Sequence, residues 1–260
     1  MSLLLDSTYV AESTARLLGL RVAVTGGTSG LGLALVRQLH REGAKVAFVA
    51  RNAERVQQVA RENPGTHGVV GDIASKDDIY PIAMQVTASL GGLDVLINNA
   101  SALGPVPLPL LLDYPADDFR RVLDTNLLAP FLLIQKLLPA LLERGGAILN
   151  VTSDAGVIGY PGWGAYGISK FGIEGLSQTW AAELDGSGVR VHWIDPGSMD
   201  TDMHRAAEPD EDPAQWADPA DVTGVFVFLA SDAARGLAGR RWRAQEDEWE
   251  QPGDVVSATA

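Results

Sequence analysis

The 260-residue sequence contains no cysteine, which excludes disulfide bonds, thiolate metal sites and cysteine nucleophiles. It contains no uninterrupted apolar run of 18 or more residues, so we expect neither a membrane-spanning segment nor a membrane partner. The N-terminus lacks a basic segment followed by an apolar stretch, so a secretory signal is not expected. Together these absences predict a soluble protein of the cytoplasm.

Basic residues are few, with 20 Lys and Arg against 33 Asp and Glu and a net charge of −13. A nucleic-acid-binding protein would be expected to carry a basic stripe, and none is evident, so we predict no nucleic-acid partner. The densest acidic cluster lies in the C-terminal tail, residues 246–260, which we interpret as solvated. We find no metal-ligand spacing and predict no metal site.

Short apolar runs alternate with amphipathic segments along the chain, which predicts a parallel sheet with helices on both faces. The expected strands are Arg21–Thr25, Lys45–Ala50, His67–Gly71, Asp94–Asn98, Gly146–Thr152, Val189–Ile194 and Leu237–Ala244. The expected helices are Leu31–Glu42, Ala53–Glu62, Asp77–Leu90, Ala116–Leu142 with breaks near Pro130 and Pro139, Ala165–Leu184 and Pro219–Ala230.

This pattern predicts a single domain over residues 21–245, with an N-terminal extension over 1–20 in which 3–18 could be helical. Residues 198–218 form the loosest region, and a loop of this length often covers a site as a lid. Parallel sheets bind ligands outside the carboxyl ends of their strands. The candidate functional residues all fall at such ends, and we therefore expect them to meet at one edge of the sheet.

Glycines link the first strand to the first helix, in the segment Thr25–Gly32. Gly26, Gly30 and Gly32 would let the backbone approach a pyrophosphate, and the helix N-terminus would supply N–H donors. A glycine-rich loop alone can be a simple tight turn, but this one follows a strand and opens a helix. We therefore predict a dinucleotide cofactor.

The end of the second strand indicates which dinucleotide is bound. An acidic residue there would bind the adenosine ribose, but this chain has Arg51 and Asn52 instead. Because a guanidinium suits a phosphate, we predict that NADP(H) is preferred over NAD(H), the alternative being a solvated surface arginine. Asp72, after the third strand, could accept from the adenine amino group or cap the next helix.

Tyr166 and Lys170 stand four residues apart on a predicted helix and can share one face. A carbonyl reduction needs a proton donor, and a nearby ammonium at about 4 Å would lower a phenol pKa by about three units, while burial opposes this. The alternative is an exposed pair on a solvated helix. Ser153, at a strand end, could aim the substrate oxygen at the phenol or serve as a turn or cap. Asn126 could hold a proton-relay water or mark a helix kink.

In order and spacing, these residues resemble the short-chain dehydrogenase/reductase family, in its shorter single-domain branch, over about residues 20–245. The resemblance implies a Rossmann-type, doubly wound α/β fold, a nicotinamide cofactor, and assembly as a homodimer or homotetramer. It implies that the catalytic residues are Asn126, Ser153, Tyr166 and Lys170. It further implies that the cofactor is bound by Gly26, Thr28, Ser29, Gly30, Leu31, Gly32, Arg51, Asn52, Asp72, Ile73, Asn99, Ala100, Tyr166, Lys170, Pro196, Gly197, Met199 and Thr201.

Three departures from the family pattern stand out. Ser101 replaces a glycine and would be strained if the backbone has positive φ there, so we expect a small local shift rather than lost binding. Asp154 follows the catalytic serine; we expect it to face away, although it could raise the tyrosine pKa or select a cationic substrate. The last strand reads Gly239–Arg243 and lacks the usual Asp-Gly-Gly ending, which favours a dimer over a tetramer.

The sequence therefore predicts an NADP(H)-dependent oxidoreductase that moves a hydride between the cofactor and a small carbonyl or alcohol substrate, with Tyr166 as general acid or base. An alternative is a dinucleotide-binding sensor on the same fold that has lost catalysis, but it predicts a broken tetrad, and this one is intact. A dehydratase or epimerase of the longer branch would need a larger C-terminal substrate domain. The pattern does not identify the substrate.

Overall fold

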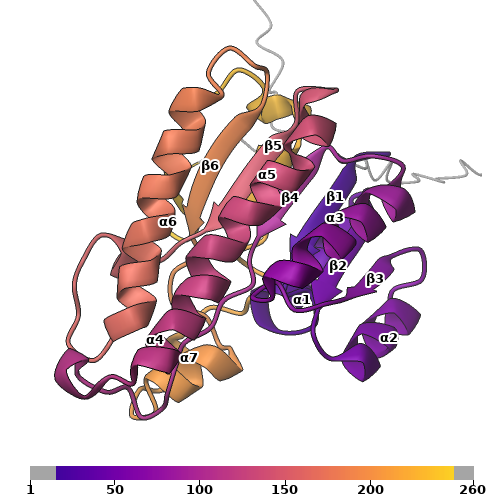
Figure 1. Ribbon diagram of the computed structural model, residues 1–260. Coiled ribbons are helices and arrows are strands. Elements are labelled where there is room, and N and C mark those ends of the chain that lie inside the picture. The colour runs from indigo at the N-terminus through magenta and orange to yellow at the C-terminus, as the bar shows by residue number, and fades with distance from the viewer. Residues whose placement is uncertain (1–15, 249–260) are drawn as a thin grey trace, which may run out of the picture.

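The computed structural model describes residues 16–248, which contain one seven-stranded parallel sheet (Figure 1). Its strands are β1 (Arg21–Thr25), β2 (Lys45–Ala50), β3 (His67–Val70), β4 (Val95–Asn98), β5 (Ala147–Val151), β6 (Arg190–Asp195) and β7 (Arg241–Arg243). Their order is β3-β2-β1-β4-β5-β6-β7, and all neighbouring strands pair in parallel. The predicted Rossmann-type, doubly wound parallel sheet is confirmed.

Helices cover both faces of the sheet. The α-helices are α1 (Gly30–Arg41), α2 (Ala53–Glu62), α3 (Lys76–Leu90), α4 (Ala116–Leu123), α5 (Ala129–Leu142), α6 (Gly164–Glu183), α7 (Asp202–Ala207) and α8 (Gly224–Ala230). The short single turns are η1 (Leu111–Asp113), η2 (Asp124–Leu128), η3 (Asp154–Gly156), η4 (Pro213–Gln215) and η5 (Asp232–Ala234). Because each face is covered, strands such as β5 are buried along their whole length, as their apolar composition indicates.

Two apolar clusters form the core, one on each face of the sheet. One cluster joins the sheet to α1, α2 and α8, and the other joins it to α3, α5 and the end of α6, which lie in front of the sheet in Figure 1. The connections after β1 first add β2 and β3 on one side of β1 and then continue with β4 on its other side. This reversal opens a crevice at the carboxyl ends of β1 and β4, which is where such folds bind ligands.

The long apolar segment Ala116–Leu142 is helical throughout, and the predicted breaks at its prolines are wrong. The segment runs through α4, a π-helical turn η2 and α5. Pro130 is the second residue of α5, directly after the π turn, where the hydrogen-bond register already changes. The run is long and apolar enough to cross a membrane, with a mean hydropathy of 1.5, but Leu133, Ile134 and Leu137 pack in the core.

Several other boundaries differ from the predicted ones. The last helix begins at Gly224 rather than Pro219, because the Asp218 carboxylate accepts from the Ala220 amide and holds a turn first. The final strand is short and pairs with β6 only over Arg241–Arg243. Residues 198–218 are not an open loop but contain α7 and η4, and Met199 forms a parallel bridge with Ala217.

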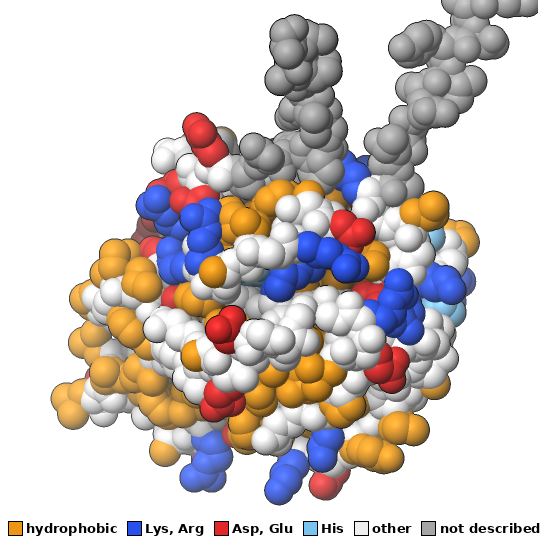
Figure 2. Space-filling model, turned by 90° about the horizontal axis from the view of Figure 1, so that it is seen from above, with side chains coloured by type: hydrophobic (Ala, Val, Ile, Leu, Met, Phe, Trp, Pro, Cys, Tyr) orange, Lys and Arg blue, Asp and Glu red, His pale blue; other side chains and the backbone are white. Residues whose placement is uncertain are grey.

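The two ends of the chain lie partly outside the described residues. Of the helix predicted over 3–18, only 16–18 are described, and these form a turn. The start of the acidic tail folds back, because Glu246 and Asp247 both pair with Arg243. On the face shown in Figure 2, basic, acidic and apolar side chains are mixed rather than grouped into one basic stripe.

Candidate active site

A cleft of about 500 Å³ opens at the carboxyl ends of the central strands, between the sheet and α7. Of the cofactor-binding residues expected from the sequence, all but one line it. These are Gly26, Thr28, Ser29, Gly30, Leu31, Gly32, Arg51, Asn52, Asp72, Ile73, Asn99, Ala100, Tyr166, Lys170, Pro196, Met199 and Thr201. The residues that the sequence predicted to bind a cofactor therefore lie together on the wall of one cleft.

The glycine loop is held in a shape that leaves its backbone open to the cleft. Gly26 has φ +72°, and a Cβ at this position would come within 2.9 Å of the Cα of Ala100. A side chain at Gly32 would overlap the carbonyl oxygen of Gly26. The Thr25 hydroxyl accepts from the backbone N–H groups of Asn99 and Ala100, both at 3.0 Å. This cradle at the N-terminus of α1 fits a pyrophosphate.

Asn99 supports the loop rather than offering its side chain to a cofactor. Its amide nitrogen donates to the Thr25 carbonyl oxygen over 2.9 Å and approaches that of Gly26 at 3.5 Å. The amide therefore ties the end of β4 to the loop that follows β1. Asn99 lies on the cleft wall, and its contact with a cofactor stays a prediction.

One arginine, Arg51, directly follows β2, and a second, Arg55, lies in the first turn of α2. Arg51 is exposed on the cleft rim and forms no ion pair within residues 16–248. Asn52 caps α2, because its side-chain oxygen accepts from the Arg55 amide over 2.9 Å. The Arg55 guanidinium in turn donates to the carbonyl oxygen of Thr28 in the glycine loop over 3.3 Å. Sequence reasoning missed Arg55; its signal was a second arginine in the first turn after the strand.

Asp72 lies on the cleft wall at the end of β3. One carboxylate oxygen accepts from the Ala74 amide over 3.1 Å, which makes a tight turn, and Ser75 rather than Asp72 precedes the first residue of α3. The helix-cap alternative is therefore wrong. The adenine contact remains a prediction, with Ile73 buried beside it.

Ser101 is not strained. No non-glycine residue among those described has positive φ, so Ser101 does not adopt the conformation in which a serine would be strained. Its hydroxyl lies on the cleft wall and is buried without a hydrogen-bond partner among the described residues. A buried hydroxyl of this kind is costly unless a ligand satisfies it.

Tyr166 and Lys170 share one face of α6, as their spacing predicts. The Lys170 ammonium lies 5.3 Å from the centre of the Tyr166 ring and donates to the Val151 carbonyl oxygen over 3.0 Å. Lys170 is 3% exposed, and both side chains line the cleft, so the alternative of a solvated surface pair is wrong. Trp163 packs on Tyr166 with ring centres 5.4 Å apart.

Burial raises the pKa of the Tyr166 phenol well above its usual range. Ser153 opposes the rise, and the charges of Asp195 and Asp154 add to it. We expected Lys170 to lower the Tyr166 pKa, but in this structure that pKa is raised and Lys170 is not among the causes of its shift. The physical reason is that the ammonium binds a backbone carbonyl rather than the phenol, while the phenol is desolvated next to two carboxylates.

Burial lowers the pKa of Lys170 to about 8, although the charges of Asp195 and Glu174 pull the other way. At neutral pH the ammonium is therefore still mostly charged, but only about one unit separates it from titration. A group balanced in this way can change its proton occupancy during a reaction near neutral pH.

Ser153 lies at the carboxyl end of β5, and Asp154 turns toward it instead of away as we expected. The Ser153 hydroxyl donates to the Asp154 carboxylate over 2.8 Å and accepts from the Ala155 amide over 3.1 Å. The other Asp154 oxygen accepts from the Tyr160 hydroxyl over 2.9 Å. The physical reason is local: the carboxylate satisfies two hydroxyls and the first amide of η3 at once.

Asn126 lies in the π turn η2 and is 3% exposed, outside the cleft wall. Its amide nitrogen donates to the carbonyl oxygen of Ala102 and to the Ser169 hydroxyl, both at 2.9 Å. Its oxygen accepts from the Ala102 amide over 2.7 Å. Both amide hydrogens are thus in use, so a relay water could bind the side chain only through the remaining lone pair of its oxygen. The helix distortion considered from the sequence is present as the π turn.

Gly197 is the expected cofactor residue that does not line the cleft. It has φ +73°, and its N–H donates to the Asp195 carboxylate over 3.0 Å. A Cβ at Gly197 would come within 2.6 Å of the Gln245 side chain, so the glycine is required by a turn. The following Thr201 caps α7 by accepting from the His204 amide over 3.2 Å.

Apolar residues form the open end of the cleft, beside Tyr166. Leu103, Met199 and Met203 contribute to its wall. His204 does not; its ring packs against Trp216 with centres 4.4 Å apart. Within residues 16–248 no group of three or more His, Asp or Glu side chains could hold a metal ion.

Comparison with known proteins gives the same family that the sequence motifs indicate. The family described as short chain dehydrogenase matches residues 21–212. The 3-oxoacyl-[acyl-carrier-protein] reductase FabG of Thermotoga maritima is 32% identical over 86% of this chain and 96% of its own. The 2,5-dichloro-2,5-cyclohexadiene-1,4-diol dehydrogenase of Sphingobium indicum is 35% identical over 85% of this chain and 93% of its own.

A solved structure of a short chain dehydrogenase from Shigella flexneri, complexed with NADP, is 30% identical to this chain. It superposes with a TM-score of 0.85 over 89% of this chain and 99% of its own. Family match, sequence relatives, fold and the glycine cradle agree. This chain belongs to the short-chain dehydrogenase/reductase family and is an oxidoreductase that uses a nicotinamide cofactor.

Proposed function

We propose that the protein is an NADP(H)-dependent oxidoreductase that interconverts a small carbonyl compound and its alcohol, with Tyr166 as the general acid or base. The observation that carries the proposal is the Tyr166–Lys170 pair on one wall of the cleft, with Lys170 buried and hydrogen-bonded to the end of β5. Ser153 belongs to the same group, because it lowers the pKa of the Tyr166 phenol against the effect of burial.

When bound, the nicotinamide cofactor supplies or accepts the hydride at the substrate carbon. The residues of the chain manage the oxygen and its proton. The raised pKa keeps the Tyr166 phenol protonated through the neutral range, which is the form that donates a proton to a reduced carbonyl oxygen. Ser153 orients that oxygen, and the Lys170 charge favours loss of the phenolic proton.

The same geometry supports reduction as the direction that runs near neutral pH. Oxidation of an alcohol needs Tyr166 as phenolate, and burial together with Asp195 and Asp154 disfavours that form. Alcohol oxidation should therefore require alkaline conditions. The two sequence relatives are named as a reductase and a dehydrogenase, so both directions occur among similar proteins.

The preference for NADP(H) is supported by Arg51 and Arg55, because no carboxylate stands at the end of β2 to repel a 2′-phosphate. Both guanidiniums are near the glycine loop, Arg55 through its bond to Thr28. The NADP complex of the similar Shigella protein is in keeping with this preference.

The test is to follow NADPH consumption with a panel of ketones, aldehydes and quinones, for the wild-type protein and for Tyr166→Phe. We expect the variant to lose about 10²-fold or more in kcat while NADPH binding is kept. Tyr80→Phe, on the exposed side of α3, is the matched control and should be unaffected. Full turnover in Tyr166→Phe would disprove the role of the phenol. NADPH binding without turnover of any compound would favour the sensor alternative.

We further propose that the protein forms a homodimer in the cytoplasm, through the apolar surface of η2 and α6. Leu128, Ile168 and Phe171 are between 43% and 47% exposed there. Light scattering coupled to size exclusion tests this, and Phe171→Glu should give a monomer. Met84 is a similarly exposed apolar residue on α3, and Met84→Glu should leave the mass unchanged. A mass of four chains for the wild-type protein would favour the tetramer instead.

A further inference from the structure

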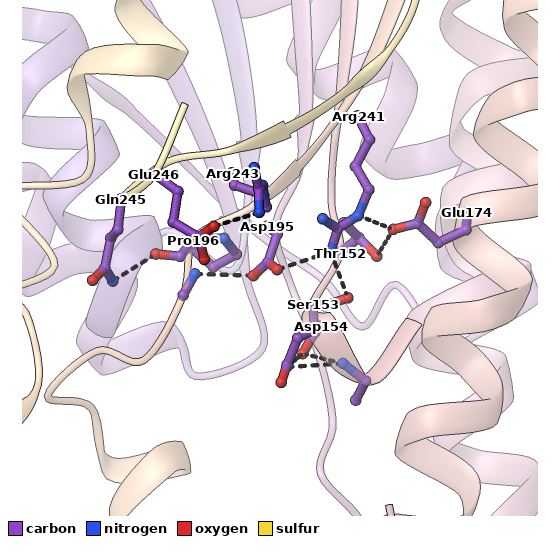
Figure 3. Close-up of polar contacts among 12 residues, drawn as sticks. Thr152, Ser153, Asp154, Glu174, Asp195, Pro196, Arg241, Arg243, Gln245 and Glu246 are labelled. Carbon is purple, nitrogen blue, oxygen red and sulfur yellow. Dashed lines mark hydrogen bonds and ion pairs between the residues drawn. The ribbon is translucent and has the colours of Figure 1, made fainter. Parts of the chain in front are cut away.

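Arg241 of β7 reaches behind the candidate active site and contacts three groups there (Figure 3). Its Nε donates to the Glu174 carboxylate over 3.0 Å, and one terminal nitrogen donates to the Asp195 carboxylate over 2.8 Å. The same nitrogen donates to the backbone carbonyl oxygen of Ser153 over 3.1 Å. The side chain is only 22% exposed, so these contacts are sheltered from solvent.

Each of these partners is connected to the residues of the proposed chemistry. Glu174 lies one helical turn beyond Lys170 on α6 and also accepts from the Thr152 hydroxyl over 2.7 Å. Asp195 ends β6, and its charge raises the pKa of both Tyr166 and Lys170. The Ser153 carbonyl belongs to the backbone that carries the serine hydroxyl.

The charges behind the cleft balance only when Arg241 is counted. Glu174 and Asp195 are 6% and 8% exposed, and a buried carboxylate requires a nearby positive charge or a proton. Lys170 supplies one charge but is hydrogen-bonded to Val151, and Arg241 supplies the other. A planar guanidinium is suited to hold two carboxylates and a carbonyl oxygen together.

We propose that Arg241 is a positioning residue of the active site, which holds the backbone of Ser153 in place and neutralises Glu174 and Asp195 behind the Tyr166–Lys170 pair. This inference rests on the proposed function. It also gives a role to one of the departures of this chain, since Arg241 lies within Gly239–Arg243, the segment that departs from the family pattern.

Removal of the Arg241 charge should raise the pKa of every titratable group nearby, because more negative charge then favours the protonated forms. The groups that face Lys170 and Tyr166 are Asp154, Asp195 and Glu174. In Arg241→Met the alkaline limit of kcat/KM for carbonyl reduction should move up by about half to one pH unit. Arg241→Lys keeps the charge and should leave this limit in place, while lowering kcat because Ser153 loses its support.

Two further variants separate charge from folding. Arg243→Met, on the same strand, removes an exposed arginine that pairs with Glu246 and Asp247, and should leave the pH profile unchanged. Adding Glu174→Gln to Arg241→Met removes one negative charge with the positive one and should return the limit toward that of the wild-type protein. A purely structural role of Arg241 would predict no such return.

A second readout does not depend on turnover. The chain has four lysines, and carbon-13 labelling at the ε position lets the titration of Lys170, which has a pKa of about 8, be followed by NMR. Its midpoint should rise in Arg241→Met and return with Glu174→Gln. Equal midpoints in Arg241→Met and Arg243→Met would overturn the inference, whereas full activity of Tyr166→Phe would overturn only the proposed function.

Discussion

Replacement of Lys170 by methionine should make the protein more stable at neutral pH while removing its activity. The ammonium is 3% exposed and has one hydrogen bond, to the Val151 carbonyl oxygen. Burial lowers its pKa from 10.5 to about 8, which means that the folded state holds the charged form at a cost. Methionine has a similar length and no charge, so it removes this cost.

The size of the effect follows from the pKa shift. A shift from 10.5 to about 8, which already includes the opposing attraction of Asp195 and Glu174, corresponds to about 3 kcal/mol at pH 7, where both the folded and the unfolded protein carry the proton. The Val151 carbonyl loses a donor in the variant, which costs about 1 kcal/mol. We therefore expect the free energy of unfolding of Lys170→Met to exceed that of the wild-type protein by about 2 kcal/mol at pH 7.

The pH dependence provides the sharper test. Because the folded pKa of Lys170 is depressed, its charge destabilises the folded state fully below pH 8. Between about 8 and 10.5 the unfolded state holds more protons, so wild-type stability rises with pH. The advantage of the variant should shrink by about 2 kcal/mol between pH 7 and pH 9.5.

Urea unfolding at the two pH values measures this difference. Lys136→Met, on an exposed position of α5, is the control and should change the free energy of unfolding by less than about 0.5 kcal/mol at either pH. If Lys170→Met is less stable than the wild-type protein at pH 7, with a difference that does not vary with pH, the reasoning from burial is wrong.

Three further predictions concern the cleft. Asp154→Asn removes a charge that raises the pKa of Tyr166, so the midpoint of alcohol oxidation should move about half a pH unit lower, and an unchanged midpoint would contradict this. Arg51→Gln and Arg55→Gln should each raise KM for NADPH about tenfold and leave KM for NADH unchanged, with Arg61→Gln, at the far end of α2, as a control without effect. Ser101→Ala should weaken cofactor binding about fivefold by calorimetry, since its buried hydroxyl has no partner among the described residues; equal affinity would show that the hydroxyl does not contact the cofactor.

The position of the cleft could be predicted because its residues belong to strand ends and tight turns. Gly26 and Gly32 occur where no side chain fits, and Tyr166 and Lys170 follow the helical spacing of α6. The glycine pattern between strand and helix and the helical spacing are local, so a single sequence reveals them, although the atoms that leave Gly26 no room belong to Ala100 and Asn99. The same holds for the alternation of strands and helices that specifies the parallel sheet.

The orientation of individual polar side chains depended on contacts between segments far apart in the sequence. Asn126 binds Ala102 and Ser169, and Asn99 binds the glycine loop, neither of which a motif specifies. Proline in Ala116–Leu142 was expected to break the helix, but packing on the core and the π turn outweigh the local preference.

The sequence by itself determined the fold class, the family and most of the residues that line the cleft, because local spacing and hydrophobic periodicity indicate them. Only the tertiary structure decided the electrostatics of the site. The pKa of Tyr166 rises rather than falls because of burial and the charges of Asp195 and Asp154, while the Lys170 ammonium binds the Val151 carbonyl oxygen. Arg241 contacts the site because β7 pairs with β6, which brings the Arg241 guanidinium to Glu174 and Asp195. Desolvation and long-range charge depend on the complete packing of the chain, which no short motif contains.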